Sequence, residues 1–153
     1  MSTPEDRIQE LGLTLPEVVP PVAAYLPAVR SGQYVYTAGQ VPMRSGSMLH
    51  PGKVGAGVDE GQAVEAAQQC ALNALAAVKS VVGELSEVKR IVKVVVFVAS
   101  DPGFTGQPKV ANGASELFGE VFGDVGRHAR SAVGVAELPL GAPVEVELIV
   151  EVR

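Results

Sequence analysis

RSAVGVAELPLGAPVEVE, residues 130–147, carries the strongest structural pattern of this chain. It predicts a hairpin of two strands around a turn that contains Leu138 and Pro139, with Arg130 opening the first strand. Because strand side chains alternate between two faces, we expect one face to collect Val133, Val135, Val144 and Val146. The opposite face would then collect Arg130, Ala132, Gly134 and Ala136 with Glu145, Glu147, Ile149 and Glu151. Because it carries one guanidinium among small residues, that face is a candidate binding surface for a small anionic ligand.

The length and composition of the chain predict a single globular domain. Its 153 residues suffice for one ordinary hydrophobic core, and 47% of them are hydrophobic while 19% are charged. No linker, repeat or low-complexity segment marks a second domain. Residues 1–153 are therefore expected to form one unit, with residues 1–21 as an N-terminal extension.

Charge and targeting patterns indicate the expected location of the protein and the classes of partner to expect. The sequence has no apolar run of about 18 residues, which argues against a membrane span, and its first residues lack the pattern of a secretory signal. A single cysteine, Cys70, fits a reducing compartment, so a cytoplasmic location is expected. The net charge of -5 and the isoelectric point near 5.0 argue against a nucleic-acid partner, because phosphate binding favours basic surfaces.

Cap and turn signals divide the rest of the chain into further elements. Thr3 and Asp59 fit helix N-caps, Gly83 fits a helix end, and Pro102 with Gly103 interrupts a strand. The predicted helices cover residues 4 to about 11, 60 to about 82, and 108 to about 122. The predicted strands are a hairpin of residues 26–30 and 33–38 and a central strand, residues 88–99, buried on both faces. Residues 44–58 are expected to form a loop or small excursion.

Small residues recur at helical spacing in the segment after Asp59. The stripe consists of Ala63, Ala66, Cys70, Ala74, Ala77 and Val81, and it would let the helix approach the sheet closely. Cys70 is therefore expected to be an inert core thiol. His50 and His128 fall in separate loops without metal-ligand spacing, so we predict no metal site.

The long elements follow the order β-β-α-β-α-β-β, which is typical of an α+β fold. Crossover connections would place both long helices on one face of a mixed sheet. The other face would carry Val95, Phe97 and Ile149. Because soluble proteins rarely leave such an apolar face open, we expect subunits to associate through it.

Several segments together resemble the RidA/YjgF family, also called the endoribonuclease L-PSP or reactive-intermediate deaminase family. They are residues 130–147, residues 25–32 and 35–42, residues 69–75 with Asn73, and residues 88–93 with Phe97. The resemblance covers roughly residues 22 to 152. It implies a chorismate-mutase-like α+β subunit that forms a homotrimer with ligand clefts between neighbours.

The resemblance also implies hydrolysis of enamine or imine intermediates, such as 2-aminoacrylate or 2-iminobutyrate, to 2-keto acids and ammonia without a cofactor. Arg130 matches the family's substrate-carboxylate arginine, and a guanidinium can bind a carboxylate through two parallel hydrogen bonds. Glu145 matches the glutamate that handles the attacking water. The remaining cleft positions are matched by Tyr25, Gly39 and Asn112, with backbone groups near Gly39 and Ala132 beside the water.

Two other functions stay open at this point. The same cleft could belong to a non-catalytic trimer that binds small carboxylates. The family's older name points to a ribonuclease or translation inhibitor, and the negative net charge of the chain disfavours that function. Ala38 stands where the family commonly has a hydroxyl residue, Ala132 stands where it commonly has a cysteine, and residues 43–59 are longer than in compact members. These departures leave the substrate open.

Overall fold

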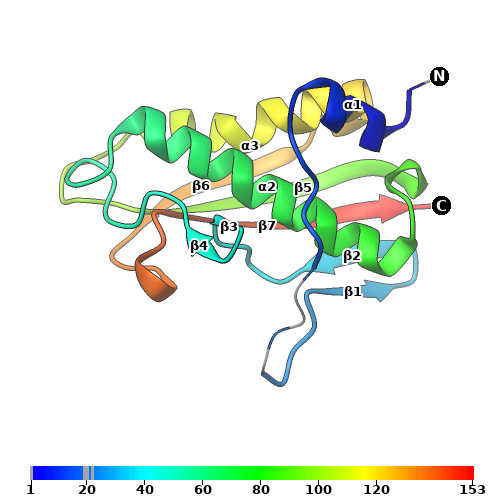
Figure 1. The fold of residues 1–153 in the computed structure, drawn as a ribbon, viewed down its shortest axis with the longest axis horizontal. Helices are drawn as coiled ribbons and strands as arrows, with labels where there is room; N and C mark the ends of the chain where they lie inside the picture. The colour runs from blue at the N-terminus through cyan, green and yellow to red at the C-terminus, as the bar shows by residue number, and fades with distance from the viewer. Residues whose placement is uncertain (1, 19–20, 22) are drawn as a thin grey trace.

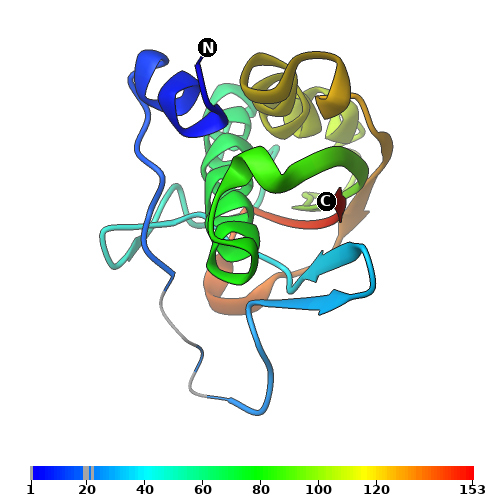
Figure 2. The ribbon, with the colours of Figure 1, turned by 90° about the vertical axis from the view of Figure 1, so that its right-hand side faces the viewer.

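The computed structural model describes residues 2–18, 21 and 23–153. Within these residues, three α-helices lie together on one side of a five-stranded sheet (Figures 1 and 2): α1 (Pro4–Glu10), α2 (Glu60–Val82) and α3 (Gln107–Phe122). The sheet contains β1 (Ala28–Ser31), β2 (Tyr34–Thr37), β5 (Val88–Ala99), β6 (Ala129–Val135) and β7 (Val144–Val152), while β3 (Met43–Arg44) pairs with β4 (Ser47–Met48). No helix among the described residues has the length and apolar character needed to cross a bilayer.

The sheet confirms the predicted succession of long elements but not the predicted final hairpin. Its strands lie in the order β1-β2-β7-β5-β6, with β5 and β6 parallel and the other neighbours antiparallel. Since β5 lies between β6 and β7 and pairs with both, the hairpin prediction is wrong. The connection between β6 and β7 is a longer segment containing the 3-10 turn η3 (Pro139–Gly141), rather than the two-residue turn of a tight hairpin.

The strand order also reverses the predicted faces. Ala132 and Val146 both pair with the buried Val96, so the three side chains lie on the helix side of the sheet. Arg130 precedes Ala132 by two residues and shares its side, whereas Glu145 is adjacent to Val146 and lies on the opposite side. The prediction that Arg130 and Glu145 share a face is therefore wrong within one subunit. A shift of one residue in relative register is enough to exchange the faces of a strand.

The side of the sheet away from the helices, called the open face below, is apolar along its centre. Its side chains include Val29, Tyr34, Tyr36, Val95, Phe97, Val133 and Ile149, in agreement with the positions predicted for Val95, Phe97 and Ile149. Val29, Tyr34, Tyr36 and Val133 are 40% to 49% exposed. The prediction that the strand at residues 88–99 is buried on both faces is wrong for the single chain, because most of its open-face residues are only half-buried. Val133 and Val135 likewise lie on this face, away from Val144 and Val146.

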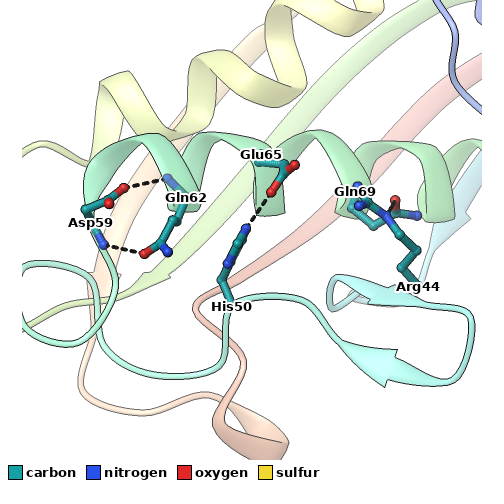
Figure 3. Close-up of polar contacts among 6 residues, drawn as sticks. All are labelled: Arg44, His50, Asp59, Gln62, Glu65 and Gln69. Carbon is teal, nitrogen blue, oxygen red and sulfur yellow. Dashed lines mark hydrogen bonds and ion pairs between the residues drawn. The ribbon is translucent and has the colours of Figure 1, made fainter.

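Helix α2 begins and ends where the sequence predicts. The Asp59 carboxylate accepts from the Gln62 N–H, and the Gln62 side chain accepts from the Asp59 N–H, which forms a capping box (Figure 3). The predicted small-residue stripe is buried except at its last residue, Val81, which is half-buried, and Cys70 Sγ lies 3.5 Å from the carbonyl oxygen of Val144 on β7. Burial raises the pKa of the Cys70 thiol, as expected for an inert core residue.

The N-terminal extension is part of the fold. Helix α1 starts at Pro4 after the Thr3 cap, as predicted. Ile8 is 1% exposed within the main core, and Arg7 Nη1 donates to the carbonyl oxygen of Val121 at 2.9 Å. The extension therefore adds a third helix beside α3. Residues 1, 19 and 20 of the predicted extension lie outside the described residues.

The segment between β2 and α2 is an ordered excursion fastened to α2. Asn73 Nδ2 donates two hydrogen bonds, of 2.9 and 3.1 Å, to backbone carbonyls at the entry to β3. Arg44 Nε donates to Gln69 Oε1 at 2.9 Å, and His50 makes a close polar contact with Glu65 (Figure 3). These contacts hold residues 43–50 along the outer side of α2.

Candidate functional site

Two side chains of α3 hold Arg130. Arg130 lies on the edge strand β6, and its Nη1 donates to Asn112 Oδ1 at 2.8 Å and to Ser115 Oγ at 3.2 Å. Asn112 and Ser115 are three residues apart and so share one side of the helix. Nη1 carries two hydrogens, and these two contacts use both. Nε and Nη2, the guanidinium edge that suits two-pronged carboxylate binding, make no hydrogen bond to the described residues.

Ser115 is linked in turn to His128, which lies in the segment between η2 (Gly123–Gly126) and β6. Ser115 Oγ and His128 Nε2 are 2.9 Å apart, and His128 Nδ1 is 2.7 Å from the carbonyl oxygen of Gly126. The imidazole ring meets the buried Phe118 ring edge-on, with centroids 5.8 Å apart. An open pocket of about 420 Å³ adjoins this cluster and is lined by Ser115, Gly119, Gly126, Arg127, His128 and Arg130.

Gly39 and Glu145 form a second cluster. Gln40 exchanges two backbone hydrogen bonds with Val146, of 2.8 and 2.9 Å, so the chain after β2 runs beside β7. A Cβ atom on Gly39 would lie 2.8 Å from Glu145 Cδ and 3.0 Å from its Oε1. The missing side chain at Gly39 is therefore what makes room for the Glu145 carboxylate.

The Glu145 carboxylate lies in an environment that favours its neutral form. Burial raises the pKa of Glu145, and the Glu147 carboxylate, two residues further along the same side of β7, raises it as well. A carboxyl group with a raised pKa exchanges protons closer to neutral pH. Glu145 is thus suited to hold a water molecule and to take and return its proton.

The predicted site residues form two separate groups within the subunit. The first group consists of Arg130, Asn112 and Ala132, on the helix side of the sheet, where Ala132 packs against the core. The second group consists of Gly39 and Glu145. Tyr25 belongs to neither group: it is 58% exposed in the segment that leads into β1 and extends below the sheet in Figure 1. One small ligand cannot touch both groups of the same subunit.

Ser115 and His128 are the members of the Arg130 cluster that the sequence reasoning misses. The usable signals are that Ser115 follows Asn112 by about one helical turn and that His128 precedes Arg130 by two residues. Neither spacing is distinctive in the sequence, because Ser115 and His128 come together only when α3 packs against β6. The described residues contain no group of three or more His, Cys, Asp or Glu side chains placed to hold a metal ion.

Comparisons with known proteins give similarities over nearly the full chain. A family model described as "YjgF/chorismate_mutase-like, putative endoribonuclease" matches residues 5–152. The chain is 48% identical to Protein TCP17 of Trypanosoma cruzi over 150 residues, which are 96% of this chain and 92% of that protein. It is 33% identical to a 2-iminobutanoate/2-iminopropanoate deaminase of Dermatophagoides farinae over 143 residues, 92% of this chain and 95% of that one. The crystal structure of a putative endoribonuclease from Shewanella oneidensis MR-1 matches with a TM-score of 0.95 and 34% identity, covering 99% of this chain and 100% of that one.

Proposed function

This chain belongs to the YjgF/chorismate-mutase-like family, and from that premise we propose that it hydrolyses reactive enamine or imine intermediates of the 2-aminoacrylate or 2-iminobutyrate type. The products are 2-keto acids and ammonia. The observation that carries the proposal is the Arg130 guanidinium, whose Nη1 is tied to α3 while its Nε–Nη2 edge makes no hydrogen bond to the described residues, beside an open pocket. The similarity to the Dermatophagoides farinae deaminase supports the same substrate class.

In the proposed reaction, Arg130 binds the substrate carboxylate through Nε and Nη2. Glu145 holds the attacking water and accepts its proton as the water oxygen bonds to the imine carbon and the C=N π electrons move to nitrogen. Glu145 returns this proton to the nitrogen, which completes the carbinolamine. It then takes the hydroxyl proton and passes it to the amine, so that the C–N bond breaks and ammonia leaves as the keto group forms. Because the imine is already reactive, positioning and one proton-transfer group suffice, and no cofactor is required.

The proposal includes a homotrimer in which Arg130 of one subunit and Glu145 of a neighbour face the same ligand. The separation of the two clusters on opposite faces of the sheet supports this arrangement. The apolar open face supports association as well, because burying Tyr34, Tyr36 and Val133 would remove apolar surface from water. The exposed Tyr25 would line a cleft at that interface.

The direct test is incubation of the protein with freshly generated 2-iminobutyrate or 2-aminoacrylate, with loss of the imine followed against a buffer control. Arg130→Ala removes a charge-assisted contact worth about 1.5 to 3 kcal/mol, so carboxylate affinity should fall about ten- to a hundredfold. Arg130→Lys should restore only part of it, because an ammonium lacks the two-pronged geometry. Glu145→Gln should spare binding and lower turnover. Small, equal effects of both substitutions on folded protein would contradict the catalytic assignment.

Two other outcomes have distinct signatures in the same experiments. Binding of 2-oxobutyrate that depends on Arg130, without acceleration of imine loss, would indicate a non-catalytic binding protein. Cleavage of single-stranded RNA that copurifies with the protein and disappears in Arg130→Ala would indicate the endoribonuclease activity in the family's description. The net charge of -5 argues against that second outcome.

A further inference from the structure

The hydrogen-bond directions around His128 follow from a single backbone carbonyl. The carbonyl oxygen of Gly126 can only accept, so His128 Nδ1, 2.7 Å away, must carry a proton and donate it. In the neutral ring, Nε2 then has a lone pair and no proton. Ser115 Oγ, 2.9 Å from Nε2, must therefore donate its hydrogen to the ring.

With its hydrogen committed to His128, the Ser115 oxygen is left as an acceptor. It accepts from Arg130 Nη1 at 3.2 Å, while Asn112 Oδ1 accepts the other Nη1 hydrogen at 2.8 Å. Two acceptors on one planar nitrogen fix the plane of the guanidinium. The chain of donors and acceptors thus runs from Arg130 through Ser115 and His128 to the Gly126 carbonyl.

We propose that Ser115 and His128 are positioning residues for Arg130: neutral His128 orients the Ser115 hydroxyl, and the serine oxygen holds Nη1 so that the Nε–Nη2 edge stays presented to the ligand carboxylate. The inference rests on the proposed carboxylate-binding role of Arg130. Neither residue touches the reacting atoms, and both act through the guanidinium.

The environment of the imidazole ring favours the neutral form of His128. Burial lowers the pKa of His128, the hydrogen bond to the Gly126 carbonyl acts in the opposite direction, and the Arg130 guanidinium lowers the pKa again. The edge-on contact with Phe118 restricts rotation of the ring. Without His128, the Ser115 hydroxyl is free to turn back to a carbonyl of its own helix, as helical serines commonly do.

The first test needs no ligand. Nitrogen-15 NMR of the His128 ring at pH 7 should show the neutral tautomer with its proton on Nδ1. The Arg130 guanidinium signals should be protected from exchange in the wild type and in His128→Gln, whose amide oxygen can replace Nε2 as an acceptor, and should lose protection in Ser115→Ala and His128→Phe. An imidazolium, the Nε2–H tautomer, or guanidinium signals that no variant changes would overturn the proposal.

The second test measures 2-oxobutyrate affinity by calorimetry and the kinetic constants for imine loss. Ser115→Ala and His128→Phe should each weaken binding about three- to tenfold and raise KM while kcat stays within about twofold. His128→Gln should recover most of the affinity. Ser80→Ala is the matched control, because Ser80 Oγ bonds to the Ala77 carbonyl on α2, away from the site.

A double substitution separates positioning from a general structural role. In the Arg130→Ala background, His128→Phe should cause no further loss of affinity, because the effect passes through the guanidinium. An equal loss in both backgrounds would overturn the positioning role. If Arg130→Ala itself leaves 2-oxobutyrate binding intact, the proposed function fails instead, so the two failures are distinguishable.

Discussion

At the scale of single residues, Gly39 lies beside the Glu145 carboxylate with no room for a side chain. A methyl group on Gly39 would lie 2.8 Å from Glu145 Cδ, so Gly39→Ala must displace that carboxylate. The displaced group is the end of a flexible side chain, which leaves the fold intact but moves the proposed water-holding oxygen. We expect kcat for imine hydrolysis to fall about 10- to 100-fold with little change in thermal stability.

Gly57→Ala is the control for this substitution. No heavy atom lies within 4 Å of a Cβ at Gly57, and its φ is outside the positive range that L side chains avoid. This variant should keep wild-type turnover. Wild-type turnover in Gly39→Ala would instead show that the position of the Glu145 carboxylate does not matter for the reaction.

Glu147 gives a prediction about pH. Its negative charge raises the pKa of Glu145, so Glu147→Gln should lower that pKa. Glu145 must be ionised to accept the proton of water, and turnover should therefore rise with pH as Glu145 deprotonates. In Glu147→Gln the rise should occur at lower pH, with the plateau unchanged, in a profile of kcat against pH. Glu10→Gln, the same change of charge on the exposed side of α1, should leave the profile in place.

The candidate site residues that could be predicted from sequence are those that individually match a family motif or position. Arg130 and Gly39 fall in such motifs, and Asn112 matches a single family position. The structure joins Arg130 to Asn112 and Gly39 to Glu145. Their grouping could not be predicted, because it depends on strand order. Ser115 and His128 escape the sequence reasoning because their role arises only from contacts between α3 and the start of β6.

At the scale of elements, two glycines on α3 differ in the space that a side chain would have. A Cβ on Gly113 would lie 2.2 Å from the backbone oxygen of Val64, where α3 crosses α2, whereas a Cβ on Gly119 would meet nothing within 4 Å. Gly113→Ala should therefore destabilise the protein by about 1 to 3 kcal/mol despite its better helix propensity. Gly119→Ala should instead stabilise it by up to about 1 kcal/mol. Urea unfolding of both variants measures the difference, and equal stability would contradict the close crossing.

Helix ends and strand positions could be predicted because local chemistry specifies them. The capping boxes at Thr3 and Asp59 satisfy backbone N–H groups within four residues of sequence. The partner strand of β6 and of β7 could not be predicted in the same way, because adjacency in sequence favours a hairpin between the two. The apolar β5 offers hydrogen-bonding edges to both strands, and the residues connecting β6 to β7 are numerous enough to let it lie between them.

At the scale of the whole molecule, one subunit has a covered face and an open one. The helices bury one side of the sheet, while the open face exposes parts of Val29, Tyr34, Tyr36 and Val133. The sequence predicts this imbalance from the element order and the apolar residues of β5 and β7. The structure adds that the Arg130 and Glu145 clusters lie on opposite sides, so the proposed site requires residues from two copies of the chain.

Mixing two impaired variants tests this shared site. Arg130→Ala subunits keep Glu145, and Glu145→Gln subunits keep Arg130, so a site between unlike neighbours can contain both residues. If each site joins two subunits, an equal mixture reassembled from denaturant should recover about one quarter of wild-type imine hydrolysis, since about one neighbouring pair in four has the productive order. Each variant reassembled alone is the control and should keep its low activity. If both residues instead served a site within one subunit, no mixture would regain activity, even when light scattering shows that mixed oligomers have formed.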